Sequence, residues 1–250
     1  MTSSEIDDWD SHWDTYGDNA RANPAQEYRR KLITEQLRRS GPVRRLIDAG
    51  AGMGDLLRDL SEDFPDAELV GLEPSEIGRK CINRDVPRAQ AINWDGLVEL
   101  VPDELRGSAS HLTCSEVLEH VDDPTVLLRN AVSGLAPGGT AVVTVPGGPK
   151  TAFDRHIGHR QHFRADGLHT MMEAAGLENV RVYRAGFPTF NLYKSALLLR
   201  GNKLVDDVAS GNDSKAPGLV MRVFERGFAS AVTRNSPFGW QLIGVGTAAF

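Results

Sequence analysis

A glycine-rich turn between an apolar strand and an amphipathic helix constrains the fold of this chain more than any other feature. The strand is predicted at residues 43–48, and the turn that follows carries Gly50, Gly52 and Gly54. In the helix that follows, the apolar side chains among residues 56–64 are expected to face the protein interior. Glycine allows tight backbone dihedrals and lets a ligand approach the main chain closely. The segment therefore predicts a strand–turn–helix unit at which a ligand binds.

The same alternation of strand and helix continues along the chain. Further strands are predicted near residues 69–72, 89–92, 111–114, 140–145, 179–185 and 238–245, with a turn at residues 137–139. Strands that alternate with helices form right-handed units and a mainly parallel sheet, so the predicted fold class is α/β. Ligands of such sheets bind beyond the carboxyl ends of the strands, which is where the strong motifs of this sequence fall.

The 250 residues suit one elaborated domain better than two independent ones. We predict an N-terminal helical arm at residues 1–42, a core at residues 43–186 and 238–250, and an inserted pair of helices at residues 187–237. The insert is long for a hairpin loop. It could cap an acceptor site, form a homodimer contact, add helices to the core or lie on a membrane surface through its basic residues.

Charge and cysteine content narrow the function. The formal net charge of -6 argues against a broad nucleic-acid-binding face, which needs a basic patch. Cys81 and Cys114 form no CxxC pair and no metal-ligand spacing, so a reduced, cytoplasmic protein is expected. Residues 1–8 lack the basic and apolar regions of a signal peptide, and no apolar run approaches a transmembrane span.

The turn differs from a dinucleotide-binding fingerprint. That fingerprint is GxGxxG, whose third glycine would fall on Asp55, whereas this sequence has its third glycine at Gly54. A carboxylate at the start of the helix would disfavour a pyrophosphate and therefore an NAD-dependent oxidoreductase. Glu73 ends the next strand, where a carboxylate can accept both hydroxyls of a ribose. Turn and acid together favour a nucleoside ligand without a pyrophosphate.

Four stretches and one later loop carry a resemblance to a known family. They are residues 47–54, 71–74, 114–124 and 135–146, and the loop at residues 158–163. In them the sequence resembles the class I S-adenosylmethionine (SAM)-dependent methyltransferases, in their small-molecule branch. The resemblance implies a Rossmann-like fold with a mainly parallel seven-stranded sheet and helices on both faces. It also implies SAM as the cofactor and methyl transfer to a small-molecule acceptor.

The resemblance further implies which residues contact SAM. The expected set is Tyr16, Asp48, Gly50, Gly52, Gly54, Glu73, Trp94, Asp95, Ser115 and Glu116. Asp48 and Gly50 would line the methionine amine and the turn, and Glu73 would hold the ribose. Ser115 and Glu116 would border the methionine part of the cofactor.

Two aromatic residues of this set leave alternatives open. Trp94 could stack on the adenine ring or could be a core or rim aromatic. Asp95 could accept a hydrogen bond from the adenine amino group. Tyr16, together with Trp13, could close over the cofactor or could simply pack the N-terminal arm.

Methyl transfer from a sulfonium is an in-line displacement, for which the protein mainly supplies proximity and alignment. A hydroxyl acceptor also gains from a general base, and histidine suits that role near neutral pH. The candidate bases are His159 and His162, followed by His120 beside Glu119. Instead of acting as bases, His159 and His162 could brace the loop, and His120 with Glu119 could cap a helix N-terminus and support its loop. With His156 three histidines could hold a metal. A flexible loop without a matched carboxylate nearby makes us expect none, although Asp154 is available.

These sequence features leave three functions to consider. The first is a small-molecule methyltransferase, with oxygen as the favoured acceptor atom. The second is a SAM-binding enzyme that catalyses a cyclisation or rearrangement without methyl transfer. The third is a non-catalytic SAM-binding partner protein, which the intact glycine turn, Glu73 and the loop histidines disfavour.

Overall fold

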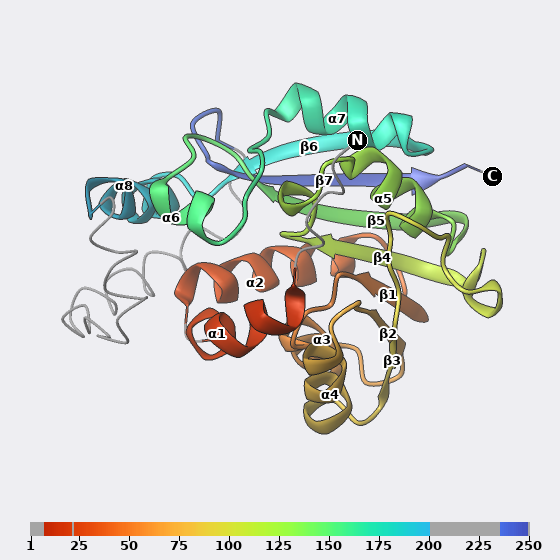
Figure 1. Cartoon of the computed structure of the whole chain (residues 1–250). Coiled ribbons are helices and arrows are strands. Elements are labelled where there is room, and N and C mark those ends of the chain that lie inside the picture. The colour runs from red at the N-terminus through yellow and green to blue at the C-terminus, as the bar shows by residue number, and fades with distance from the viewer. Residues whose placement is uncertain (1–7, 22, 201–235, 250) are drawn as a thin grey trace, which may run out of the picture.

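The computed structural model describes residues 8–21, 23–200 and 236–249. Its centre is a seven-stranded sheet in the order β3-β2-β1-β4-β5-β7-β6 (Figure 1). The strands are β1 Arg45–Ala49, β2 Glu68–Leu72, β3 Ala89–Ile92, β4 Ala109–Ser115, β5 Leu135–Pro146, β6 Leu177–Ala185 and β7 Gln241–Ala248. The first five strands pair in parallel, and β7 inserts antiparallel between β5 and β6. The predicted mainly parallel seven-stranded sheet is confirmed.

The starts of two strands differ most from the sequence prediction. Strand β5 begins at Leu135, so residues 137–139, predicted as a turn, lie inside the strand. The reason is its partner β4, since Ala109 pairs with Leu135 and a bulge follows before the regular register. Strand β7 begins at Gln241 because residues 236–239 form a turn that is closed by the Gly239 N–H on the Ser236 carbonyl.

Helices cover both faces of the sheet (Figure 1). They are α1 Trp9–Arg21, α2 Pro24–Arg39, α3 Asp55–Asp63, α4 Glu76–Asp85, α5 Pro124–Val132, α6 Ala152–His156, α7 Ala165–Ala174 and α8 Thr189–Arg200, with short 3₁₀ turns η1 Asp103–Leu105 and η2 Leu118–His120. Asn23 and Asp123 cap α2 and α5 by accepting backbone N–H groups, each followed by a proline that suits the first helical turn.

The core consists of two apolar clusters, one on each face of the sheet. Leu128 of α5 and Met172 of α7 belong to the first, and Tyr28 of α2 and Leu57 of α3 belong to the second. Each of these side chains is almost completely buried, and full burial of a large apolar side chain contributes about 1.5–3 kcal/mol. The two clusters hold the sheet rigid beneath its carboxyl edge, where the candidate site lies.

Two further helices come from the predicted arm and the predicted insert. Helix α1 of the predicted arm contacts α4, because the Asp10 carboxylate accepts from Ser75 Oγ at 2.5 Å and from the Ile77 N–H at 3.1 Å. Helix α8 occupies the first part of the predicted insert and packs its buried Phe190 against Tyr28 of α2. The second helix predicted for the insert lies outside the described residues.

Candidate active site

The glycine turn between β1 and α3 has the backbone that its sequence predicts. Gly50, Gly52 and Gly54 have φ angles of 74°, 55° and 81°, the left-handed region that side chains disfavour. A Cβ atom on Gly50 would lie 2.4 Å from the side chain of Val117, and one on Gly52 would lie 2.8 Å from the ring of Trp13. Both the conformation and the close contacts therefore require glycine.

Glu73 ties the end of β2 to this turn. Its side chain is buried, and its two oxygens accept from the Gly52 N–H at 2.7 Å and the Ser75 N–H at 3.0 Å. Burial raises the pKa of Glu73, and these two N–H donors oppose that rise. Because a carboxylate offers about four acceptor sites, Glu73 keeps acceptor capacity for ribose hydroxyls.

Asp48 is the penultimate residue of β1, just before the same turn. It is buried and accepts a hydrogen bond from Thr113 Oγ1 on β4 at 2.7 Å. Burial raises the pKa of Asp48 to about 7. A cationic group placed against this carboxyl would favour its charged form.

Ser115 ends β4 and Glu116 follows it, and other residues of the protein hold both side chains. Ser115 Oγ lies 2.9 Å from Thr144 Oγ1. The Glu116 carboxylate pairs with Arg29 of α2 at 3.1 Å and accepts from Gln241 of β7 at 2.9 Å. Glu116 has a positive φ of 57°, which turns the chain sharply at the strand end. Its side chain therefore joins a buried polar cluster, and the backbone is what remains to face a cofactor.

Trp94 and Asp95 occupy different surroundings. Trp94 is only 2% exposed, belongs to the apolar core and donates from Nε1 to the Glu99 carbonyl at 3.2 Å. The structure thus places it as a core aromatic, the second of the two alternatives. Asp95 is exposed and accepts from the Leu97 N–H within a turn.

Helix α1 lies over the glycine turn and the neighbouring histidines. The Trp13 ring contacts the Gly52 position, and the ring of Trp9 meets that of His120 edge-on at 5.2 Å. The side chain of Tyr16 lies outside the described part of the structure. The arm therefore covers the site, with Trp13 as its described contact to the turn.

The three candidate histidines come together at the ends of β4 and β5. His120 belongs to η2, while His159 and His162 lie in the loop between α6 and α7. The ring centroids of His120 and His159 are 4.7 Å apart, and His159 Nδ1 lies 3.2 Å from His162 Nε2. His156, by contrast, ends α6 and is exposed.

Burial keeps this cluster uncharged. It lowers the pKa of His120 to about 4 and that of His159 to about 2, and it also lowers the pKa of His162. All three rings are therefore neutral near pH 7, so each has one nitrogen that donates and one that accepts.

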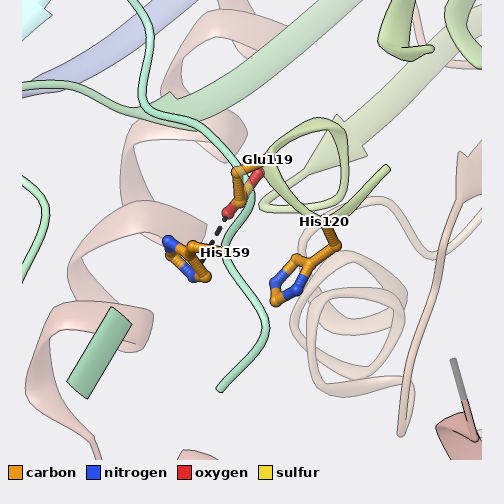
Figure 2. A group of neighbouring side chains, drawn as sticks. All are labelled: Glu119, His120 and His159. Carbon is orange, nitrogen blue, oxygen red and sulfur yellow. Dashed lines mark ion pairs between the residues drawn. The ribbon is translucent and has the colours of Figure 1, made fainter. Parts of the chain in front are cut away.

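The hydrogen bonds then assign the protons. Because a carbonyl only accepts, the 3.1 Å contact between His162 Nδ1 and the Gly148 carbonyl places a proton on Nδ1. The Nε2 atom of neutral His162 is then an acceptor, so His159 donates to it from Nδ1. His159 Nε2 is left with a bare lone pair, 3.9 Å from Oε1 of Glu119 (Figure 2).

A buried ion pair joins α8 to the histidine loop. Lys194 Nζ lies 2.7 Å and 2.8 Å from the two carboxylate oxygens of Asp154 in α6. Asp154 also closes a capping box with Thr151. Although burial alone would raise it, the pKa of Asp154 is lowered to about 2 by Lys194. The insert helix is thereby fixed against the loop that carries His159 and His162.

Sequence reasoning missed Arg29, Gln241 and Lys194 as parts of this site. Gln241 and Glu116 are 125 residues apart, and Lys194 and Asp154 are 40 residues apart. No short motif joins them, since their contacts arise only from the sheet order and from the packing of α8.

Comparison with known proteins places these features in a wider group. A family model described as a methyltransferase domain matches residues 21–182. The chain is 28% identical over 144 residues to a ubiquinone biosynthesis O-methyltransferase of Xanthomonas axonopodis pv. citri, across 56% of this chain and 58% of that protein. It is 30% identical over 144 residues to a trans-aconitate 2-methyltransferase of Methylobacterium radiotolerans, across 56% of this chain and 50% of that protein. The matched region thus spans 58% and 50% of the length of these relatives.

Solved structures share the fold. A TehB-like SAM-dependent methyltransferase of Corynebacterium glutamicum superposes with a TM-score of 0.60 at 15% identity, across 95% of this chain and 98% of that chain. A phosphoethanolamine N-methyltransferase 2 of Haemonchus contortus, solved with S-adenosyl-L-methionine, gives a TM-score of 0.55 at 14% identity, across 98% and 61% of the two chains. At such identities the likeness concerns the fold alone.

Proposed function

This chain belongs to the methyltransferase domain family, and we propose that it transfers a methyl group from SAM to oxygen on a small-molecule acceptor. The family and the cofactor predicted from the sequence motifs are confirmed. The relative named as an O-methyltransferase supports oxygen as the acceptor atom.

One observation carries this proposal most directly. A neutral histidine with a bare lone pair, His159, lies at the ends of β4 and β5, the same edge of the sheet as the glycine turn and Glu73. A neutral imidazole in this position can receive the proton that a hydroxyl loses as it attacks the methyl group. We assign the cofactor contacts to the glycine turn, Glu73 and Asp48, and the acceptor side to His120, His159 and His162.

The arm and the insert complete the proposed site. Helix α1 would cover the cofactor through Trp13, and α8 would cap the acceptor side through the Lys194–Asp154 pair. None of the helices that the structure describes is long and apolar enough to cross a membrane. Together with the net charge of -6, the enclosed histidine cluster supports a small molecule over a nucleic acid as the acceptor.

The direct test incubates the full chain with SAM carrying an isotope-labelled methyl group and a panel of small hydroxylated acceptors. Mass spectrometry should detect a labelled product and an equal amount of S-adenosylhomocysteine. Conversion of an acceptor to an unlabelled isomer, with SAM unchanged, would instead establish a cyclisation or rearrangement. SAM binding without turnover of any acceptor would favour a non-catalytic role.

A further inference from the structure

A set of potential metal ligands lies within the histidine cluster. Glu119, His120 and His159 each offer one nitrogen or oxygen atom, and these three atoms all lie within 4.8 Å of one another (Figure 2). The side chains are almost fully enclosed, with exposures of 0% for Glu119 and 8% for each histidine. The set is held by two different segments, η2 and the loop after α6.

Glu119 is the unusual member of this set. Neither of its carboxylate oxygens has a hydrogen-bond partner among the described residues. The buried cations nearby have other partners, since Arg29 pairs with Glu116 and Lys194 pairs with Asp154. A buried carboxylate without a partner is strongly unfavourable, so the fold keeps this acid at a cost that a ligand would relieve.

Two hydrogen bonds already orient His159 toward Glu119. His159 donates from Nδ1 to His162, which in turn donates from its own Nδ1 to the Gly148 carbonyl. Metal-ligating histidines are held in the same way, with the second ring nitrogen donating to a fixed partner. The remaining lone pair on His159 Nε2 faces Glu119 Oε1 at 3.9 Å, too far for a hydrogen bond.

We propose that Glu119, His120 and His159 bind a divalent transition-metal ion. Ligand bonds of about 2.0–2.2 Å let one ion join atoms up to about 4.2 Å apart, which covers the 3.9 Å between His159 Nε2 and Glu119 Oε1. Two imidazoles and one carboxylate suit zinc, cobalt, manganese or iron, whereas magnesium and calcium prefer oxygen ligands alone. Three protein ligands leave coordination positions open.

The site revises the expectation that no metal would be bound. That expectation depended on the absence of a matched carboxylate beside the loop histidines. Glu119 is that carboxylate, and the fold brings it to His159 from the end of a neighbouring strand.

The open positions connect the ion to the chemistry, and this step rests on the proposed function. An acceptor hydroxyl bound to the ion would lose its proton to water more easily, because a divalent ion lowers the pKa of a bound oxygen. With the ion bound, His159 is a ligand and no longer a base. Proton transfer to His159 and activation of the acceptor by a bound ion both need the lone pair on His159 Nε2, so they exclude each other. Whether the protein binds the metal decides between them.

The test uses the full chain after chelator treatment, without SAM or acceptor. Zn²⁺ binding is measured by calorimetry, and Co²⁺ is added separately to record its visible absorption bands. The wild-type chain should bind one ion. Glu119→Gln and His159→Ala should each weaken binding at least about 10–100-fold and abolish the cobalt bands. The matched control is His169→Ala with Glu173→Gln, an exposed histidine–glutamate pair on α7 with ring nitrogen and carboxylate 3.2 Å apart, which should bind as the wild type does.

Thermal unfolding supplies a readout that a merely structural role would not produce. With chelator present, Glu119→Gln should be at least as stable as the wild type, because it removes an unpaired buried acid. With Zn²⁺ present, the melting temperature should rise for the wild type and stay constant for Glu119→Gln. No ion binding by the wild type, or equal binding by all variants, would overturn the proposal. Because SAM and acceptor are absent, that result would leave the proposed methyl transfer untouched.

Discussion

At the scale of single residues, Glu73 has one task in the structure and a second that we propose. It accepts backbone N–H groups from Gly52 and Ser75, and we propose that its remaining lone pairs accept ribose hydroxyls. We expect Glu73→Ala to weaken SAM binding about ten- to a hundred-fold, as the loss of a charged hydrogen bond implies. Calorimetry on protein that circular dichroism shows to be folded measures this. An affinity equal to that of the wild type would remove Glu73 from the cofactor site.

Asp48 makes stability depend on pH in a predictable direction. Its pKa is about 7 in the folded chain and 3.8 as the ordinary value. Between these values the folded state keeps a proton that the unfolded state has lost, so the free energy of unfolding falls as pH rises from about 4 to about 7. Asp48→Asn should remove this contribution, which amounts to at most about 4 kcal/mol.

The measurement for Asp48 is urea unfolding of both proteins across that pH range. Other acids titrate there too, so the quantity to compare is the difference between wild type and Asp48→Asn. The variant should gain stability relative to the wild type as pH rises, and a difference that stays constant would contradict the raised pKa. SAM should also bind the wild type more tightly above pH 7, since ionised Asp48 attracts its cationic groups.

The sequence predicted individual residues well where a short motif carries them. Gly50 and Gly52 have the left-handed φ angles that the turn motif predicts, and Glu73, which follows the next strand, accepts from the Gly52 N–H. Trp94 shows the limit, because its sequence position is compatible with both adenine stacking and the core. Burial at 2% exposure decides for the core, and burial depends on the whole fold.

At the scale of elements, the junction between α8 and α6 depends on one buried ion pair. Lys194 and Asp154 side chains are each 6% exposed. Removing one partner of such a pair costs about 3–5 kcal/mol, because the other charge stays buried. We therefore expect Lys194→Met to lower the free energy of unfolding by that amount in urea denaturation.

A second variant distinguishes the ion pair from simple packing at this junction. Asp154→Asn in the Lys194→Met background removes the stranded charge, so the double variant should be more stable than Lys194→Met alone. If Lys194→Met and the double variant unfold at the same urea concentration, the unpaired Asp154 carboxylate is not the cause of the lost stability. Lys31→Met, from an exposed pair with Glu27, is the matched control and should change stability by less than about 1 kcal/mol.

Helices and strands were predictable from periodicity, and their ends were less so. The caps at Asn23 and Asp123 are encoded locally, because each side chain accepts a backbone N–H group and each is followed by a proline. The start of β5 is not encoded locally, because Leu135 becomes a strand residue only by pairing with Ala109 of β4. The contacts of α1 with α4 likewise depend on tertiary packing, through Asp10 and the start of α4 at Ser75.

At the scale of the whole molecule, the sheet order assembles a site from segments far apart in the chain. Strands β1, β4 and β5 are adjacent, so the turn after β1 lies beside the loops after β4 and β5. Sequence alternation predicted this edge as the site. It could not predict that the histidine cluster would be enclosed by α1 on one side and α8 on the other, since both helices are placed by long-range contacts.

That enclosure changes the expected pH dependence of the reaction. An exposed histidine base would give an activity limb near its ordinary pKa of about 6.5. Burial lowers the pKa of His159 to about 2 and that of His120 to about 4, so both stay neutral throughout the range in which an enzyme of this kind is assayed. We therefore expect kcat, measured with a chelator present, to be flat between about pH 5.5 and 8 apart from titration of the acceptor itself.

His159→Ala tests the base assignment under the same conditions. If His159 receives the acceptor proton, kcat should fall about 10²–10⁴-fold while SAM affinity stays intact. In His162→Ala, kcat should fall less than in His159→Ala, because His162 acts by orienting His159 through one hydrogen bond. The control is His169→Ala, which removes a partly exposed histidine on α7 and should retain full activity. Full kcat in both His159→Ala and His162→Ala would exclude these two histidines as bases and leave Glu119 and His120 as candidates. If the two histidines only brace the loop, their removal should instead raise the acceptor KM or lower the stability of the protein.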